Sequence, residues 1–511
     1  MVSLDRSLVL PVAPPIRLPA PPPATGLRRL LDRLADRLAP PATRAPLVAV
    51  NLAAVAFFLL SFSRHGVGFG RYRIDLDVYR IGSQVWLRHG DLYGLLPATS
   101  SGVHLPFSYP PIAAVLLAPL ALMPFAAADT VLTLATVATM ALVLRVFLRS
   151  ATEAGGREAR TWRTACWLLP VALFLEPVRN TLGYGQVNVL LMALVTADCL
   201  LPEVRWPRGA LVGLAAAVKL TPAAFVLFFL CRGDRRAAAT AAASFGAVST
   251  VGFALAWHDS VRYWTSIIVQ TGRPGSPVYA ANQSIEAVLA RAGLDPHTPA
   301  GTATWLALSA IVLALAWRGM RVAPAPAPAP ALALAGPSDA WALTLNALAA
   351  LLISPISWSH HWVWVEPGLL ALAVVSVRGR YRAGLAAAVA GLVLFAASPQ
   401  WWFPNGDNRE IHWAAWEQVI GSSYVIAAVA VLLFASLRPR AFLNPGREQV
   451  HDLGDADRAL VGTPFGGVDP AQVGPAVELR ERVPERGRGR IGGKRGGDVV
   501  GEIAALRAFR R

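Results

Sequence analysis

The stretch R-G-A-L-V-G-L-A-A-A-V-K-L-T-P-A-A-F-V-L-F-F-L-C-R-G-D-R-R, residues 208–236, decides the fold class. Its central block, 209–231, is apolar apart from Lys219 and Thr221. A block of this length can cross the apolar core of a bilayer once. Arginine nevertheless flanks it on both sides, and arginine-rich flanks favour the cytoplasmic side. We therefore expect a broken pair of short helices that turns near Lys219–Pro222 and returns both flanks to one side.

The composition of the whole chain favours a membrane protein. Hydrophobic residues make up 55% of the 511 residues and charged residues 15%, with a mean hydropathy of +0.47. Soluble domains carry about 25% charged residues, so these charges are too few to coat several soluble globules. The net charge of +16 comes from arginines near the termini and between apolar blocks. That distribution indicates a basic cytoplasmic face rather than nucleic-acid binding.

The same reasoning orders the other apolar segments into an all-α polytopic membrane protein of about 12 transmembrane helices. Tyr109–Met123 is expected to be a membrane-surface or re-entrant helix, because a full span there would place the arginine-rich segment 149–163 outside. Both termini are then cytosolic. The expected spans are 46–62, 126–148, 164–180, 187–202, the broken pair within 208–231, 237–257, 302–318, 339–357, 361–377, 383–397 and 418–437.

Three regions follow from this organisation. Residues 1–45 form a Pro-rich, basic cytosolic arm, and 46–437 form the transmembrane domain. Residues 438–511 are rich in Gly, Pro and Arg, so we expect a disordered cytosolic tail. The run A-P-A-P-A-P-A-P-A at 323–331 predicts a stiff spacer in a cytosolic loop.

Acidic residues suited to catalysis follow the first span, in an outer loop. Asp75 and Asp77 are two residues apart, so they would point to different faces of a helix or to the same face of a strand. Either could be a solvated loop acid. Held beside the membrane, a carboxylate could instead act as a general base toward a sugar hydroxyl.

Cationic and imidazole side chains occur inside or beside apolar segments. Lys219 is one of only two lysines in the chain. Burying it in a span costs roughly 2.5–3.5 kcal/mol on insertion scales, so it either snorkels to an interface or faces a cavity and binds an anion such as phosphate. The adjacent His360 and His361 lack the i, i+4 spacing of a helical zinc pair. They are either satisfied interfacial histidines or hydrogen-bond donors to a phosphate.

Neutral polar and aromatic residues on the outer loops could bind a sugar. Gln186, Asn188, Asn282 and Gln283 carry amides of the kind that hold sugar hydroxyls. Trp358 belongs to a group of tryptophans that fit a membrane-interface belt, or alternatively stack on sugar rings. The sequence has no outer-face carboxylate cluster that would call for a metal ion.

These motifs, in their order along 46–437, resemble the polyprenol-phosphate-mannose-dependent mannosyltransferases of glycosyltransferase family 87, in the C-type membrane superfamily. No single motif is specific, but the ordered series is. It comprises D-L-D-V-Y (75–79), D-L-Y (91–93), F-S-Y-P-P (107–111), G-Q-V-N (185–188), K-L-T-P (219–222), A-N-Q-S (281–284) and S-P-I-S-W-S-H-H-W (354–362).

The resemblance implies a C-type bundle with its active site on the extracytoplasmic face of the plasma membrane. It implies inverting transfer of mannose from a polyprenyl phosphate donor to a glycolipid or lipoglycan acceptor, often as an α-1,2 linkage on a phosphatidylinositol mannoside. Asp75 matches the family's first-loop acid and is expected to be the general base, with Asp77 in reserve. Neither a cofactor nor a metal is expected.

The resemblance also implies the roles of the remaining site residues. Lys219, His360 and His361 would bind the donor phosphate. The substrate-binding residues would be Asp77, Tyr109, Gln186, Asn188, Asn282, Gln283 and Trp358.

Two rival functions remain at this point. A related enzyme could use another lipid-linked sugar, such as arabinofuranose, or another acceptor. A transporter or lipid flippase is a different class. The sequence has no internal repeat relating its two halves, and its polar residues gather on one face rather than at mid-membrane, which favours the transferase.

Overall fold

A computed structural model describes residues 43–61, 72–151, 158–270, 272–273, 275–322, 337–378 and 381–437. All of them belong to a compact unit that spans Met1–Val450. Most of the predicted basic arm, the proline-rich run at 323–331 and the predicted tail from 438 onward lie outside the described residues. The boundaries predicted for those regions stay predictions.

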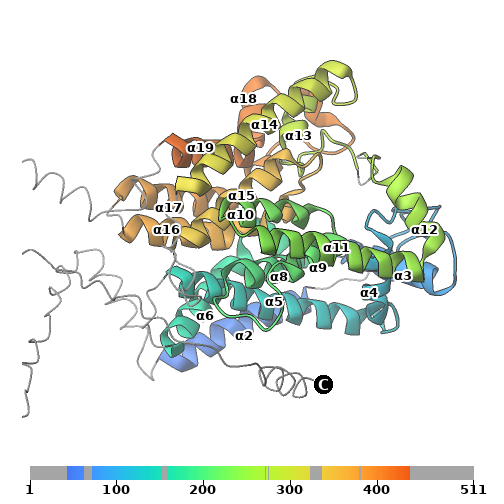
Figure 1. Cartoon of the computed structure of the whole chain (residues 1–511), viewed down its shortest axis with the longest axis horizontal. Helices are drawn as coiled ribbons and strands as arrows, with labels where there is room; N and C mark the ends of the chain where they lie inside the picture. Colours follow the sequence, from blue (N-terminus) through green and yellow to red (C-terminus); the bar gives the residue numbers. More distant parts are fainter. Residues whose placement is uncertain are drawn as a thin grey trace, which may run out of the picture. The chain divides into compact units, whose positions relative to one another are not determined.

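Helices, most of them α-helices, make up most of the described part, and its β-structure is a single isolated bridge between Asn282 and Trp358. Each predicted span coincides with one helix or one pair of helices (Figure 1). These helices are α2 (Arg44–Leu60), α5 (Phe125–Ala151), α6 (Glu158–Phe174), α8 (Asn188–Leu200), α9 (Ala210–Val218), α10 (Val226–Cys231), α11 (Arg235–Leu255), α14 (Pro299–Val322), α15 (Pro337–Ile353), α16 (Val365–Arg378), α17 (Arg382–Ala397) and α19 (Ser423–Leu437).

Shorter helices and turns join these elements. They are α3 (Ile74–Leu87), α4 (Pro111–Ala121), α7 (Glu176–Tyr184), η2 (Thr221–Phe225), α12 (Trp257–Arg262), η3 (Tyr263–Ile267), α13 (Ile285–Arg291), η4 (Ser359–Trp364), η5 (Pro399–Trp401), η6 (Arg409–His412) and α18 (Ala415–Gly421). Within Tyr109–Met123, α4 is a helix separate from α5, as predicted, and the turn before Phe125 divides the two. Its place at the membrane surface or as a re-entrant helix stays a prediction.

Within the described residues, four helices are long and apolar enough to cross a bilayer alone: α5, α11, α14 and α17. A fifth candidate is the pair α18 and α19, which is bent by 66°. The other apolar helices are shorter, α2, α8 and α15 among them. The chain is therefore a helical membrane protein, and the count of about 12 spans stays a prediction.

The predicted break at Lys219 is confirmed. Lys219 has extended backbone angles, φ −147° and ψ 125°, and ends α9. Pro222 follows, and it has no N–H to continue the helical hydrogen bonding. A Cβ on Gly209 would lie 2.0 Å from the Ala237 carbonyl oxygen, and one on Gly213 would lie 2.3 Å from that of Ala241.

These two close approaches show that α9 and α11 run side by side in the same direction. Since α11 begins beside the start of α9, the chain between them must go out and come back. The pair α9 and α10 is thus a helical hairpin with its tip near Lys219. Both of its arginine flanks lie at one end of the bundle, as predicted.

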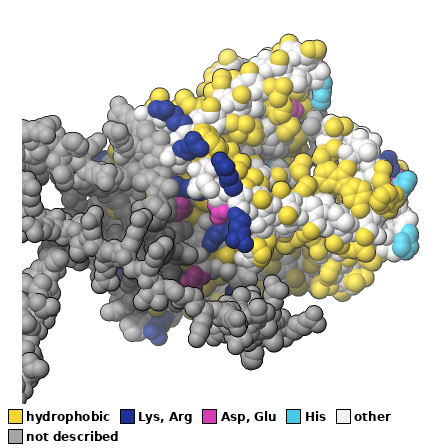
Figure 2. Space-filling view, in the orientation of Figure 1, with side chains coloured by type: hydrophobic (Ala, Val, Ile, Leu, Met, Phe, Trp, Pro, Cys, Tyr) yellow, Lys and Arg dark blue, Asp and Glu magenta, His cyan; other side chains and the backbone are white. Residues whose placement is uncertain are grey.

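Arginines gather at this end, which we call the basic end. Arg232 at the close of α10 forms an ion pair with Asp339 of α15 at 2.7 Å. Arg318 of α14 donates a hydrogen bond to the Ser436 carbonyl at the close of α19. Figure 2 shows Lys and Arg side chains together near the start of α11, with hydrophobic side chains over much of the face beyond.

Candidate active site

The first site residue, Asp75, lies in the first turn of α3. The segment was predicted to be a loop, but it folds as a helix because its buried side chains, Leu76, Val78 and Tyr79 among them, pack inward. Asp75 and Asp77 point to different faces of that helix, which was one of the two predicted alternatives. Asp75 is half-buried and accepts a hydrogen bond from the Gln186 side chain.

Asp77 has a different environment. Its carboxylate accepts hydrogen bonds from the Tyr72 hydroxyl and from the Ser100 backbone N–H at 2.8 Å and hydroxyl at 3.0 Å. Arg80 lies 3.8 Å away. These partners come from before, within and after α3, so the Asp77 carboxylate is already occupied.

The joint between α7 and α8 carries two amides of the site, Gln186 and Asn188, and the first of them reaches Asp75. Gly185 ends α7 in the left-handed region, φ 72°, and a Cβ there would lie 2.7 Å from the Leu76 Cβ. Glycine is therefore required for α3 to pack against this joint. The next residue, Gln186, accepts hydrogen bonds from the hydroxyls of Tyr79 at 2.6 Å and Tyr109 at 3.1 Å.

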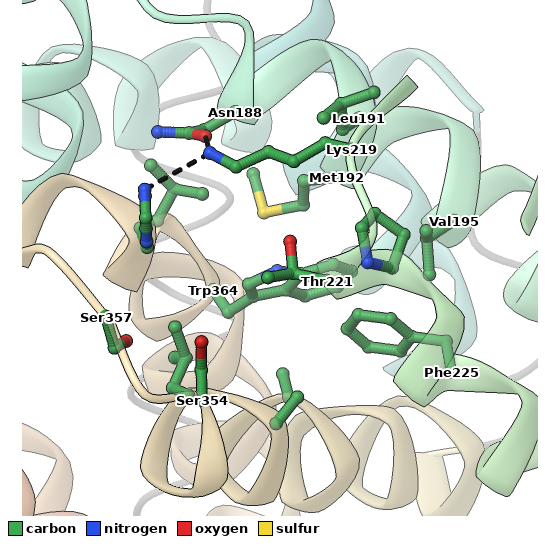
Figure 3. Close-up of a pocket in the computed structure, with 16 residues that line it drawn as sticks. Asn188, Leu191, Met192, Val195, Lys219, Thr221, Phe225, Ser354, Ser357 and Trp364 are labelled. Atoms are coloured by element: carbon green, nitrogen blue, oxygen red, sulfur yellow. Dashed lines mark hydrogen bonds between the residues drawn. The ribbon is translucent and has the colours of Figure 1, made fainter. Parts of the chain in front are cut away.

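Lys219, at the tip of the hairpin, faces the second amide. Its Nζ donates to the Asn188 Oδ1 at 2.9 Å and lies 3.1 Å from the His361 Nε2. The Tyr109 ring centroid is 5.4 Å from the same nitrogen. An ammonium has only donors, so the His361 Nε2 accepts, and this leaves its Nδ1–H as a donor. Figure 3 marks hydrogen bonding of Lys219 with dashed lines.

The two histidines of η4 play different parts. The backbone carbonyl of His360 accepts hydrogen bonds from the Thr181 hydroxyl and the Asn188 amide, both at 2.9 Å. The His360 ring is buried against Tyr184, and neither ring nitrogen has a hydrogen-bond partner among the described residues. His361 therefore contacts Lys219, whereas His360 holds η4 against α7 and α8 through its backbone.

Burial raises the pKa of Asp75 to about 6, although the Gln186 hydrogen bond and the Lys219 charge both lower it. Desolvation disfavours the carboxylate form, while the two partners favour it. The carboxylate is thus more basic than an ordinary aspartate and still mostly ionised at neutral pH.

A cavity opens beside Lys219, between α8, η2, α15 and η4. It contains about 530 Å³ of empty space, open solvent at its mouth included. Asn188, Lys219 and His361 contribute polar groups, and most of the other lining residues are apolar. In Figure 3, Asn188 and Lys219 lie together at one end, with Val195 and Phe225 on the far side. Asp75 does not line this cavity, but the charge of Lys219, which does, acts on its carboxyl group.

Residues 107–355 match the sequence profile of glycosyltransferase family 87. A polyprenol-phosphate-mannose-dependent alpha-(1-2)-phosphatidylinositol mannoside mannosyltransferase of Mycobacterium tuberculosis is 37% identical over 439 residues, covering 82% of this chain and 99% of that protein. The chain belongs to glycosyltransferase family 87.

Two further relatives agree with this assignment. The protein of the same description from Mycolicibacterium smegmatis is 38% identical over 400 residues, 76% of this chain and 88% of the relative. A phosphatidylinositol pentamannoside mannosyltransferase of Mycobacterium tuberculosis is 32% identical, over 79% of this chain and 92% of its own. No solved structure matches the chain significantly.

In this family-87 glycosyltransferase, three of the predicted substrate residues lie in a separate cluster. Asn282 donates to the Pro277 and Pro355 carbonyls and accepts from the Ser357 N–H. Gln283 donates to the Ala280 and Gly421 carbonyls. Trp358 packs its ring against Tyr279 and pairs its backbone with Asn282. These groups tie the loop before α13 to the segment before η4.

Sequence reasoning missed two residues that shape the site. Tyr79 connects Gln186 and Tyr109 through its hydroxyl, and Thr181 binds the His360 carbonyl. Tyr79 stands inside the D-L-D-V-Y motif, so its signal was available. Thr181 gave none. Across the described residues, no three His, Cys, Asp or Glu side chains come together as metal ligands would.

Proposed function

We propose that the protein transfers mannose from polyprenol-phosphate-mannose to a phosphatidylinositol mannoside and forms an α-1,2 linkage. The activities for which the relatives are named motivate the donor and the acceptor. The observation that carries the chemistry is the position of Lys219. Its ammonium lies against Asn188 and His361, is attracted by the Asp75 carboxylate, and borders the largely apolar cavity.

In the proposed reaction, Asp75 is the general base. It takes the proton of the acceptor hydroxyl while that oxygen attacks the anomeric carbon of the mannose. The new carbon–oxygen bond forms as the bond from the anomeric carbon to the phosphate oxygen breaks, so the configuration inverts. The polyprenyl phosphate leaves with the bonding electrons. It is a stable anion, so it needs no proton from the enzyme.

Lys219 and His361 bind the leaving phosphate in this proposal. The ammonium and the Nδ1–H of His361 are donors suited to a phosphate, and their effect grows as charge develops in the transition state. Asn188 orients the ammonium from the other side. With these groups carrying the phosphate charge, we propose that transfer requires neither a metal ion nor a cofactor.

The cavity would then take the first part of the polyprenyl chain. Leu191, Met192, Val195, Phe225 and Leu351 form apolar walls beside the phosphate-binding groups. The donor has a phosphate head group followed by a hydrocarbon tail. This order matches the phosphate-binding groups and the apolar walls that follow them.

We further propose that the protein lies in the plasma membrane, with both termini in the cytosol and the site on the extracytoplasmic face. The helix α3, which carries Asp75, lies with α12 at the end of α11 away from the basic end (Figure 1). The positive-inside rule orients the arginines toward the cytosol.

Asp75→Asn tests the proposal. In membranes supplied with labelled polyprenol-phosphate-mannose and a phosphatidylinositol mannoside, transfer should fall at least about 100-fold, because general base catalysis contributes on the order of 10²–10⁴. Asp407→Asn is the matched control, since Asp407 is an outer-loop acid with an 87% exposed side chain. Full transfer by Asp75→Asn would refute the base assignment.

Two alternatives give different results in the same assay. A related transferase would leave mannose untouched and transfer another lipid-linked sugar. A transporter or flippase would form no glycosidic bond at all, even in the wild type.

A further inference from the structure

Arg273 lies in the segment between η3 and α13. Its Nη2 donates to the Tyr93 carbonyl at 2.9 Å, and its Nε lies 3.4 Å from the Phe107 carbonyl. The guanidinium carbon is 5.9 Å from the centroid of the Tyr93 ring. Of the carboxylates in the described ranges, none lies within 4.0 Å of it. Arg273 is half-buried, so its position is defined but one side remains accessible.

A second guanidinium lies nearby. Arg262 of α12 binds both carboxylate oxygens of Asp91, at 2.7 and 2.5 Å, and its side chain is 38% exposed. Burial and the Arg262 charge lower the pKa of Arg273, but a guanidinium stays protonated at neutral pH. The Asp259 carboxylate accepts a hydrogen bond from the Leu92 N–H and does not pair with Arg273. Asp91 binds Arg262 directly and acts on Arg273 only as a nearby charge, so no carboxylate in the described ranges forms an ion pair with Arg273.

Two tyrosines connect Arg273 to the active site. The Tyr93 hydroxyl donates to the Tyr109 carbonyl at 2.7 Å. The Tyr109 ring in turn lies against the Lys219 ammonium, and its hydroxyl reaches Gln186. Arg273 is thus held rigidly near the site but beyond contact with the reacting atoms. That position suits a part of the substrate remote from the reaction.

We propose that Arg273 binds the phosphodiester of an anionic lipid acceptor, with Arg262 adding to the positive potential. The assignment rests on the proposed function, because a phosphatidylinositol mannoside is such a lipid. Inositol and mannose rings separate its phosphodiester from the reacting hydroxyl, so the phosphate site must lie some distance from Asp75. A planar guanidinium binds phosphate oxygens through paired donors.

The test compares two acceptors with one labelled donor, polyprenol-phosphate-mannose. The acceptors are a phosphatidylinositol mannoside and n-octyl α-mannoside, which carries no phosphate. Arg273→Gln should raise the KM for the phosphatidylinositol mannoside about 10- to 100-fold, the loss expected for a charged hydrogen bond. Its rate with n-octyl α-mannoside should equal that of the wild type.

Arg88→Gln is the matched control, since Arg88 is an exposed arginine just after α3. It should leave both acceptors unchanged. Arg273→Lys keeps the charge but not the planar donor pair, and should recover part of the lost affinity, so a folding defect in the Gln variant does not end the test. Equal losses on both acceptors, or no loss on either, would overturn the phosphodiester site.

The same experiment distinguishes a failure of the proposed function from a failure of the Arg273 site. If the wild type transfers mannose to neither acceptor, the proposed function is wrong whatever Arg273 does. If the wild type uses both acceptors and Arg273→Gln does not distinguish them, only the acceptor-phosphate site is wrong.

Discussion

Asp75 shows how local surroundings set the chemistry of one side chain. The neighbouring acid, Asp77, has hydrogen-bond donors on several sides, from Tyr72 and Ser100. Asp75 has fewer, and burial raises its pKa to about 6. Of the two acids, Asp75 therefore suits a base that must take a proton at neutral pH.

A pH profile should reveal this carboxyl. Only the ionised form of Asp75 can accept a proton, so kcat/KM for transfer should fall as pH drops through about 6, rather than through the 3.8 of an unperturbed aspartate. Gln186 lowers this pKa through its hydrogen bond. Gln186→Leu should therefore move the acid limb to higher pH. An acid limb that stays in place in Gln186→Leu would contradict the assignment of the limb to Asp75.

The sequence predicted which charged residues meet and was less informative about amides. Lys219 and His361 were both expected at the donor phosphate, and they lie 3.1 Å apart. Asp75 interacts with the Lys219 charge but does not line the cavity beside it. A buried lysine requires partners wherever it lies, so its signal is strong. Asn282 and Gln283 were expected at the sugar, yet they bind backbone carbonyls. Whether an amide serves a loop or a ligand depends on backbone geometry that residue type alone does not specify.

At the scale of elements, α3 is anchored where Asp75 needs it. Arg73, directly before the helix, forms a buried ion pair with Asp129 of α5 at 2.9 Å. The same guanidinium donates to the Phe58 carbonyl at the close of α2 at 2.7 Å. The start of α3 is thus held on one side by this pair and packs against Gly185 on the other.

Breaking the Arg73–Asp129 pair should destabilise the protein. Arg73→Gln leaves an unpaired carboxylate among side chains that are 1% and 5% exposed. The cost should be about 3–5 kcal/mol of unfolding free energy. The double variant Arg73→Gln/Asp129→Asn should recover part of it, because no buried charge is left alone. Unfolding of the purified protein in detergent measures both, and additive losses would contradict a direct pair.

The helices themselves were largely predictable, and their breaks less so. Apolar runs located each long helix, and Pro222 with Lys219 marked the break in the hairpin. The division of 164–180 between α6 and α7 was not foreseen, since α6 ends at Phe174. The buried Glu176 that opens α7 binds Trp401 and Tyr424, which are far along the chain. Contacts of this kind become visible only when the chain is folded.

For the whole molecule, the arrangement of helix ends separates the arginines that flank the hairpin from the site. Arg208 and Arg232 lie where the hairpin begins and ends, and Lys219 lies at its tip. Alternating helices carry the chain between these two ends, which is why loop charge predicted which residues would meet. The number of bilayer crossings depends in addition on helices too short to span alone, so hydropathy did not determine it.

Cysteine labelling would establish this topology. In intact cells, a membrane-impermeant maleimide should modify a cysteine placed at Asp407, on the site side, and leave one at Arg236 unmodified until the membrane is opened. The chain has three cysteines of its own, Cys166, Cys199 and Cys231, each with a free thiol. They should be replaced by serine first. The reverse labelling pattern would place the arginines outside and contradict the proposed orientation.

The hairpin of α9 and α10 also constrains how the sequence can change. Each added or deleted residue in α9 turns everything after it by about 100° around the helix axis. Such a change would swing the Lys219 ammonium away from Asn188 and His361. Replacing one small apolar residue of α9 by another, at positions other than Gly209 and Gly213, would leave the direction of the Lys219 side chain unchanged. We therefore expect this short helix to tolerate substitutions far more readily than insertions or deletions.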